Sequence, residues 1–209
     1  MNRTVKLLMI SDIFIITGFG LIDPILAIFI KDNLIDGTIF AAGLSTTIFL
    51  VTKSIIQLPF SRYVDSHDDK VRFLIIGTFL ISFVPFIYIF ATSMKYIYIA
   101  QFIHGIGSGL AFPTWLGLWS SHLDRKHESF EWSLYSAIVS IGTAIAGASG
   151  AAIAQFLSFR VSFFIVFIAS LVGSFILFGL ERREGKKSRE IKIMHYHQKR
   201  KSHHLHKYS

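Results

Sequence analysis

The stretch "FLIIGTFLISFVPFIYIFATSM", residues 73–94, runs for 22 residues without an Asp, Glu, Lys or Arg. An α-helix needs about 20 apolar residues to cross the hydrocarbon core of a bilayer. A transmembrane β-strand alternates apolar with polar residues and is only about 10 residues long, so it does not fit this run. The stretch therefore predicts a membrane-spanning helix.

Similar runs flank this stretch on both sides. Residues 96–123, 132–159 and 161–180 carry no charge, and the earlier runs 7–30 and 38–60 carry two charges and one. With 52% hydrophobic and 16% charged residues, the chain of 209 residues is too apolar for a soluble domain. We predict an all-α, polytopic membrane protein whose residues 1–180 form six transmembrane helices. The predicted bounds are about 7–30, 38–60, 71–93, 96–120, 132–155 and 160–180.

The formal net charge of +8 is concentrated at the end of the chain. Residues 181–209 hold 10 Lys and Arg against 3 Asp and Glu, so residues 1–180 sum to only +1. This distribution is a tail rather than a basic groove, and we expect no nucleic-acid partner. We predict that residues 181–209 form a disordered, His-rich cytoplasmic tail that contacts anionic lipid headgroups. Its histidines lack a fold to hold them in place, so we expect no metal site.

Lys and Arg residues mark the cytoplasmic side of a membrane protein. If the N-terminus lies inside, the inner segments hold 17 Lys and Arg and the outer segments hold 3. We therefore expect both termini in the cytoplasm and a location in the plasma or inner membrane. The first run contains Asp12 and Asp23 and has no small-residue cleavage site, so we expect a retained helix rather than a signal peptide.

Two segments of the chain share a motif. "GFGLIDP" (Gly18 to Pro24) and "GSGLAFP" (Gly107 to Pro113) both fit G-x-G-L-x-x-P and lie 89 residues apart. The first helix would run outward and the fourth inward, which is the inverted-repeat plan of secondary transporters. We predict a 3+3 inverted repeat, with chance recurrence of Gly and Pro as the alternative. Kinks at the prolines and close helix packing at the glycines are expected. The residues concerned are Gly18, Gly20, Pro24, Gly105, Gly107, Gly109, Pro113, Gly142, Gly147 and Gly150.

Polar residues form stripes along four of the predicted helices. Polar atoms are costly against lipid, so these stripes should face protein or water. We expect helices 7–30, 38–60, 96–120 and 132–155 to surround a polar interior, and helices 71–93 and 160–180 to face lipid. The predicted pathway for a solute or ion comprises Asp12, Asp23, Lys53, Gln57, Gln101, His104 and Trp115.

Three charged residues in the first two helices are the most expensive to insert. Lys at a helix centre costs roughly 2.5–3.5 kcal/mol on insertion scales. Counted from the predicted inner helix ends at 1.5 Å per residue, Lys53 lies at about 10 Å, Asp12 at about 8 Å and Asp23 near 24 Å. These depths predict an Asp12–Lys53 pair and leave Asp23 for proton or cation coupling. Snorkelling of Lys53 to the inner headgroups is the alternative.

Taken together, these features resemble the N-terminal six-helix half of the major facilitator superfamily over about residues 7–180. That family carries G-x-x-x-D-(R/K)-x-G-(R/K)-(R/K) between its second and third helices, and here "SRYVDSHDDK" supplies Asp65 and Lys70, with Arg72 nearby. The resemblance implies that this loop latches one half of a transporter against the other.

Two further family motifs match only in part. The R-x-x-Q-G of the fourth helix is replaced by "QFIHG", so Gln101 stands where the family has Arg and His104 where it has Gln. In the fifth helix, "GTAIAGASGA" keeps Gly142 and Gly150 of the antiporter motif but lacks its Pro. The chain thus lacks the Arg of the family's proton relay and the Pro of its antiporter motif.

The resemblance implies a secondary transporter, or half of one, that moves a small solute by alternating access, with proton-coupled efflux as one form. The family normally has twelve helices, so we expect a homodimer or a second six-helix half, besides the lipid bilayer and the solute. The alternatives are a non-transporting scaffold or accessory subunit, and a truncated transporter fragment. No nucleophile elbow or phosphate loop appears, so we expect neither an enzyme nor a cofactor.

Overall fold

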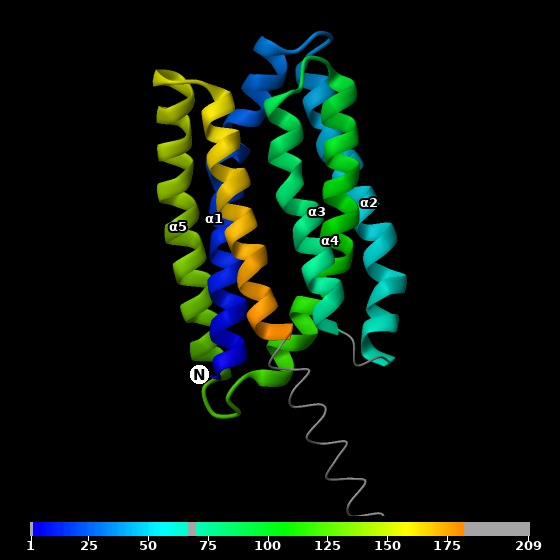
Figure 1. Cartoon of the computed structure of the whole chain (residues 1–209), viewed down its shortest axis with the longest axis vertical. Helices are drawn as coiled ribbons and strands as arrows, with labels where there is room; N and C mark the ends of the chain where they lie inside the picture. The colour runs from blue at the N-terminus through cyan, green and yellow to red at the C-terminus, as the bar shows by residue number, and fades with distance from the viewer. Residues whose placement is uncertain (1, 67–69, 182–209) are drawn as a thin grey trace, which may run out of the picture.

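The computed structural model describes residues 2–66 and 70–181. In this part of the chain it confirms an all-α fold of six long helices (Figure 1). They are α1 (Arg3–Asn33), α2 (Ile39–Ser66), α3 (Lys70–Ile89), α4 (Met94–His122), α5 (Glu128–Phe156) and a last helix without a label, Phe159–Glu181. The predicted basic tail lies outside the described residues, except for Glu181.

The length and composition of the helices fit a membrane. Five of the six described helices are long and apolar enough to cross a bilayer. The exception is α4, which is 29 residues long but carries Gln101, His104 and several Gly and Ser residues. The sequence predicted this helix because residues 96–123 carry no Asp, Glu, Lys or Arg.

Helix α2 continues further than the sequence predicted. Pro59 lies inside the helix, which ends at Ser66 rather than near residue 60. The Ser61 hydroxyl donates to the Leu58 carbonyl at 2.8 Å, and the Ser66 hydroxyl donates to the Tyr63 carbonyl at 3.0 Å. The second of these bonds satisfies a carbonyl group in the last turn of the helix, where acceptors otherwise lack partners. As a result, Asp65 lies in the last turn of α2 and not in a loop.

Three other helix boundaries differ from the prediction by four residues. α1 begins at Arg3 instead of residue 7. α5 begins at Glu128 instead of residue 132. α3 ends at Ile89 instead of residue 93, because the Phe90 and Ala91 amides bond to carbonyls three residues earlier. The Thr92 carbonyl accepts a hydrogen bond from the Ile35 amide at 3.1 Å. This bond joins the turn at residues 34–38 to the turn at residues 90–93.

The helices form two groups of three. α1 packs against α5 and the last helix, and α4 packs against α2 and α3 (Figure 1). The N-terminus, residues 123–127 and the end of the last helix lie at one end of the bundle, which we call the N-terminal end. The turns 34–38, 90–93 and 157–158 lie at the opposite end.

The helix contacts follow the predicted repeat. A Cβ placed on Gly107 of α4 would lie 2.7 Å from the Gly77 carbonyl of α3. Its counterpart 89 residues earlier, Gly18 of α1, has Val166 of the last helix as a neighbour, and Val166 is 89 residues after Gly77. The contact between α4 and α3 is thus repeated between α1 and the last helix. In an inverted repeat of three helices, a contact between one pair of helices recurs between the corresponding pair, as it does here.

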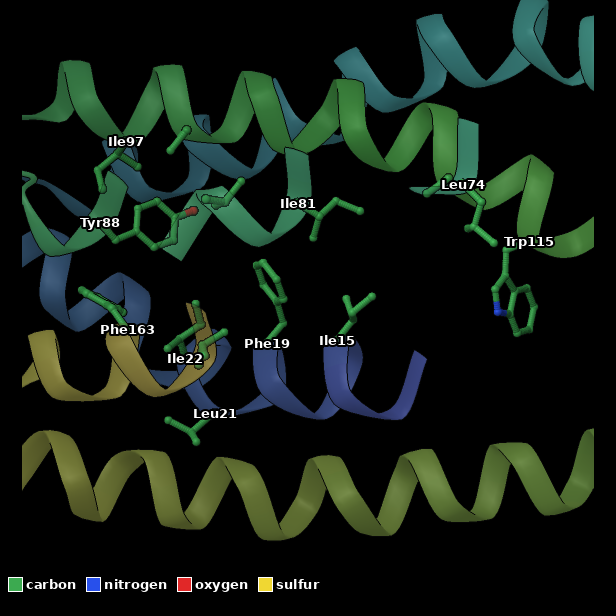
Figure 2. Packing of buried hydrophobic residues seen from close by; sticks show 14 of the residues in the cluster. Ile15, Phe19, Leu21, Ile22, Leu74, Ile81, Tyr88, Ile97, Trp115 and Phe163 are labelled. Carbon is green, nitrogen blue, oxygen red and sulfur yellow. The ribbon is translucent and has the colours of Figure 1, made fainter. Parts of the chain in front are cut away.

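An apolar core joins the two groups of helices. Ile15 and Phe19 point from α1 towards Ile81 of α3, while Leu21 points towards α5 (Figure 2). All four residues are at most 9% exposed. The core holds α1 in the middle of the bundle, where its two aspartates can reach the space between the groups.

Candidate functional site

A cavity of about 550 Å³ lies between the two groups of helices. Every one of the six described helices contributes to its wall, so the cavity is a property of the whole bundle. Its ionisable and polar lining residues include Asp12, Asp23, Lys53, Thr78, Gln101, His104, Ser108, Trp115 and Tyr135. Its volume is in the range of small-molecule sites.

The cavity corrects one expectation about the helix arrangement. α3 and the last helix were expected to face lipid only, yet Leu74, Thr78 and Ile81 of α3 and Leu177 of the last helix line the cavity. These two helices also meet each other inside the bundle, because the Ser82 and Ser174 hydroxyls lie 2.9 Å apart and are fully buried. A few Ser and Thr residues are thus enough to let an apolar helix turn one face inward.

The two aspartates of α1 have different surroundings. The Tyr135 hydroxyl of α5 donates a hydrogen bond to the half-buried Asp12 carboxylate. Asp23 lies 11 residues further along α1 and its side chain is open to the cavity. Among the described residues, no hydrogen bond or ion pair reaches the Asp23 carboxylate. Asp23 is therefore the carboxylate available to a solute or an ion.

The predicted Asp12–Lys53 pair was wrong: no ion pair joins these residues. The depth of Lys53 had been counted from a helix end near residue 60, but α2 continues for 13 residues beyond Lys53. At 1.5 Å per residue, Lys53 lies about 20 Å from the N-terminal end of the bundle, whereas Asp12 lies about 14 Å from it. The Lys53 amine instead lies 4.7 Å from the centre of the Phe112 ring, in a cation–π contact.

Aromatic rings cross the middle of the cavity. The His104 ring of α4 stacks between Phe19 of α1 and Phe49 of α2, with ring centroids 4.8 Å and 4.3 Å away. This stack connects the two groups of helices, because α1 belongs to one group and α2 and α4 to the other. All three rings line the cavity.

Two buried polar atoms in the cavity wall have no partner. The Gln101 side chain is 6% exposed and its Oε1 accepts no hydrogen bond. The Trp115 side chain is 9% exposed and its Nε1–H donates none. Trp115 packs against Tyr135 and stacks on Trp119, with centroid distances of 5.2 Å and 4.9 Å. Unsatisfied polar atoms of this kind are costly in a membrane unless a ligand or water meets them.

Several predicted residues lie away from the cavity. Gln57 of α2 is half-buried but does not line it. The exposed Asp65 lies in the last turn of α2, and Lys70 begins α3. The Arg72 Nε donates to the Glu181 carboxylate at 3.3 Å, which joins the ends of α3 and the last helix.

Most of the predicted glycines lie where helices cross. A Cβ on Gly105 or Gly109 would lie within 2.8 Å of side-chain atoms of α2, and one on Gly20 or Gly142 would lie within 2.7 Å of side-chain atoms across the α1–α5 contact. At Gly150 the Leu21 carbonyl oxygen would lie only 1.9 Å away. Gly147 faces α1 more loosely, and Pro24 and Pro113 lie inside α1 and α4.

The cavity residues that sequence reasoning missed include Phe19, Phe49, Tyr88 and Tyr135. Tyr135 had a usable signal, because a phenolic hydroxyl inside an apolar span usually needs a polar partner. The two phenylalanines had none, since the chain contains 21 Phe residues and most of them look alike in the sequence.

Comparisons with known proteins agree with this architecture. The sequence profile of the Major Facilitator Superfamily matches residues 8–202. Quinolone resistance protein NorA from Staphylococcus aureus strain Mu50 is 25% identical over 179 residues, covering 82% of this chain and 45% of that protein. The NorA of strain MRSA252 matches equally well. The chain therefore spans less than half the length of these curated relatives.

A solved structure shares the fold. The crystal structure of the POT family transporter PepTSo superposes with a TM-score of 0.68 at 16% identity. The match covers 88% of this chain and 38% of that one. At this level of identity the likeness concerns the fold alone.

Proposed function

The chain belongs to the Major Facilitator Superfamily, and we propose that it moves a small solute across the membrane by alternating access. It is a multi-pass membrane protein and a member of a transporter family rather than an enzyme. One observation carries the proposal: a cavity of about 550 Å³, walled by all six described helices, holds Asp23 and Lys53 without an ion pair. A sealed membrane bundle would be expected to pair or exclude such charges.

The proposed transporter contains a second six-helix unit. α5 and α2 bury the smallest share of their apolar spans among the five candidate spans, and both carry exposed Ser or Thr residues. A second unit packed on these helices would cover their polar side chains and close the cavity. Either a second copy of this chain or a different six-helix half meets this requirement, and cross-linking in native membranes distinguishes the two.

We assign coupling to Asp23. A carboxylate that faces the cavity and has no partner among the described residues can take up a proton or a cation from either side as the transporter opens alternately. Proton-coupled efflux is the form of transport we propose, and the relatives named as quinolone resistance proteins are consistent with it. The lack of an Arg at position 101 means that the proton relay would rest on Asp23.

For the orientation, we propose that both termini are cytoplasmic and that the protein lies in the plasma membrane. The support is the excess of Lys and Arg, 17 against 3, on the segments assigned inside. Reporter fusions at Lys95 and Glu128 test it. An active cytoplasmic reporter at Glu128 and an inactive one at Lys95 are expected, and the reverse pattern would invert the topology.

Transport itself is tested in proteoliposomes with a pH-sensitive dye trapped inside and a panel of small solutes added outside. The proposal predicts that at least one solute drives proton movement and that the Asp23→Asn variant abolishes it. The matched control is Asp32→Asn, which removes an exposed carboxylate from the last turn of α1 and leaves the cavity unchanged. If no solute moves protons or accumulates, transport by a homodimer of this chain is refuted, which leaves a different six-helix half or the scaffold and accessory alternatives.

A further inference from the structure

A second cavity, of about 430 Å³, lies at the end of the bundle opposite the N-terminal end. Its walls are the last turns of α1, parts of the turns 34–38 and 90–93, and the start of the last helix (Figure 1). It shares no lining residue with the cavity described above. A ligand in this second cavity would therefore be separate from a solute in the space between the two groups of helices.

The polar lining of the second cavity carries a single positive charge. Among the described residues that line it, Arg160 has the only ionised side chain, and Asn33, Thr92 and Ser158 supply one amide and two hydroxyls. No acidic side chain in the described part of the chain forms an ion pair with Arg160. The lining thus offers several donors to an anion and no carboxylate to a cation.

The surroundings of Arg160 leave its charge unbalanced. Asp32 and Asp36 neighbour lining residues in the sequence, but both are exposed and neither lines the cavity. Arg160 is also the second residue of the last helix, where the partial charge of a helix is positive and a cation is unfavourable. The amides of Phe159 and Arg160 find no acceptor among the described residues. An anion in the cavity would balance the guanidinium and bond to these amides as well.

Apolar side chains form the rest of the lining. Phe29 is 5% exposed and its ring centroid lies 5.5 Å from that of Phe159, and the other apolar lining residues are Ile35 and the buried Ala91. The last helix has 23 residues, or about 34 Å, so that it reaches past a hydrocarbon core of about 30 Å. The cavity at its start therefore lies near the level of the lipid headgroups, with apolar rings beside a cation.

We infer that the second cavity binds the phosphate group of an anionic phospholipid. The Arg160 guanidinium donates to two phosphate oxygens, a bidentate geometry that Lys cannot provide. Asn33 and Thr92 bond to the hydroxyls of a glycerol headgroup, and Phe29 and Phe159 contact the first carbons of the acyl chains. This site is independent of the proposed transport, because it lies outside the cavity to which transport is assigned.

The charge of the lining predicts which headgroup binds best. Phosphatidylglycerol brings one net negative charge and two hydroxyls. Phosphatidylcholine brings the same phosphate together with an ammonium group, which would lie near Arg160 and meet no carboxylate in the lining. Inorganic phosphate has similar oxygens but no acyl chains, so it would leave the apolar wall uncovered and bind more weakly.

A reporter beside the cavity tests this inference without a signal from lipid bound to the basic tail, which starts at the opposite end of the bundle. Leu157 is 70% exposed, adjoins Ser158 and does not line the cavity. The chain has no cysteine, so Leu157→Cys labelled with bimane gives one reporter on the full chain in detergent. The probes are dioctanoyl phosphatidylglycerol, dioctanoyl phosphatidylcholine and inorganic phosphate. We expect saturable binding of phosphatidylglycerol, at least tenfold tighter than that of either other probe.

The variants separate the site from general attraction to a charged surface. Arg160→Gln should weaken phosphatidylglycerol binding at least tenfold and phosphatidylcholine binding less than twofold. Lys95→Gln, which removes an exposed lysine at the same end of the bundle, is the matched control and should change both affinities less than twofold. Asn33→Leu keeps every charge and should weaken phosphatidylglycerol binding at least threefold, so it tests the cavity even if Arg160→Gln fails to fold by circular dichroism.

Each result supports or overturns the inference. Equal affinity for the two lipids overturns it, and so does an equal loss of phosphatidylglycerol binding in Arg160→Gln and Lys95→Gln. Inorganic phosphate that competes as well as phosphatidylglycerol overturns the lipid as the source and assigns the cavity to a soluble phosphate. The assay involves no transport, so its failure leaves the proposed function standing, and a failure of transport in proteoliposomes leaves the lipid site standing.

Discussion

Gly18 and Gly107 occupy the same place in the two copies of the G-x-G-L-x-x-P motif, yet the structure predicts opposite effects for their replacement by Ala. At Gly107 the new Cβ would lie 2.7 Å from the Gly77 carbonyl oxygen and 3.0 Å from side-chain atoms of Leu80 and Ile81. At Gly18 the nearest atoms, on Val166 and Ala169, would be 3.7 Å away, an ordinary van der Waals contact.

The size of the difference follows from two terms. Replacing Gly by Ala in a helix interior favours folding by up to about 1 kcal/mol, and this term is common to both variants. Forcing an extra carbon into a tightly packed contact costs about 1–3 kcal/mol, and only Gly107→Ala bears this cost. We therefore expect Gly107→Ala to be less stable than Gly18→Ala by about 1–3 kcal/mol.

Thermal unfolding in detergent, followed by the fluorescence of the three Trp residues, measures this difference. A change of 1 kcal/mol shifts Tm by about 2–4 °C for a chain of this size, so the two variants should differ by about 2–12 °C. Gly117→Ala is the control, since Gly117 also lies in α4 but has nothing within 4 Å of its Cβ position. A Tm for Gly107→Ala at or above that of Gly18→Ala would refute the packing described for α3 and α4.

Three further predictions concern hydrogen bonds and the ion pair. Ser82→Ala should destabilise the protein by about 1 kcal/mol, and Ser174→Ala should add little on top of it, because both remove the same bond; chemical or thermal unfolding of the single and double variants measures this. Tyr135→Phe should cost about 1.5–3 kcal/mol when Asp12 is present and much less in Asp12→Asn, a difference that a double-mutant cycle detects and that additive effects would contradict. Arg72→Gln should change stability by less than about 1 kcal/mol, since its ion pair is exposed; if transport is lost while Tm is unchanged, Arg72 acts in gating.

The fold could be predicted from the sequence because uncharged runs of 20 or more residues leave few alternatives. The inverted repeat was also visible, through a motif of Gly and Pro residues that the structure places at corresponding helix contacts. Helix ends were harder to predict. The end of α2 was predicted near residue 60, but the helix passes through Pro59 and continues to Ser66.

The cavity could be predicted only in part. The spacing of Asp12, Lys53, Gln101 and His104 marked them as inward-facing, and all four line the cavity. Which groups pair depends on how far one helix is shifted along another, and an error of six residues in one helix end changes the depth by about 9 Å. Because of this error, Lys53 was predicted as the partner of Asp12. The observed partner is Tyr135, which lies on α5.

The central claim is that the space between the two groups of helices is a water-filled path rather than a sealed core. The chain has no cysteine, so single-cysteine variants need no other change. Thr46→Cys and Ile16→Cys place a thiol in the cavity wall, and Phe175→Cys places one on the outer face of the last helix. In membranes treated from both sides with a charged maleimide, we predict rapid labelling at positions 46 and 16 and little at 175, because a thiol needs water to ionise. Equally slow labelling at all three positions would contradict the claim.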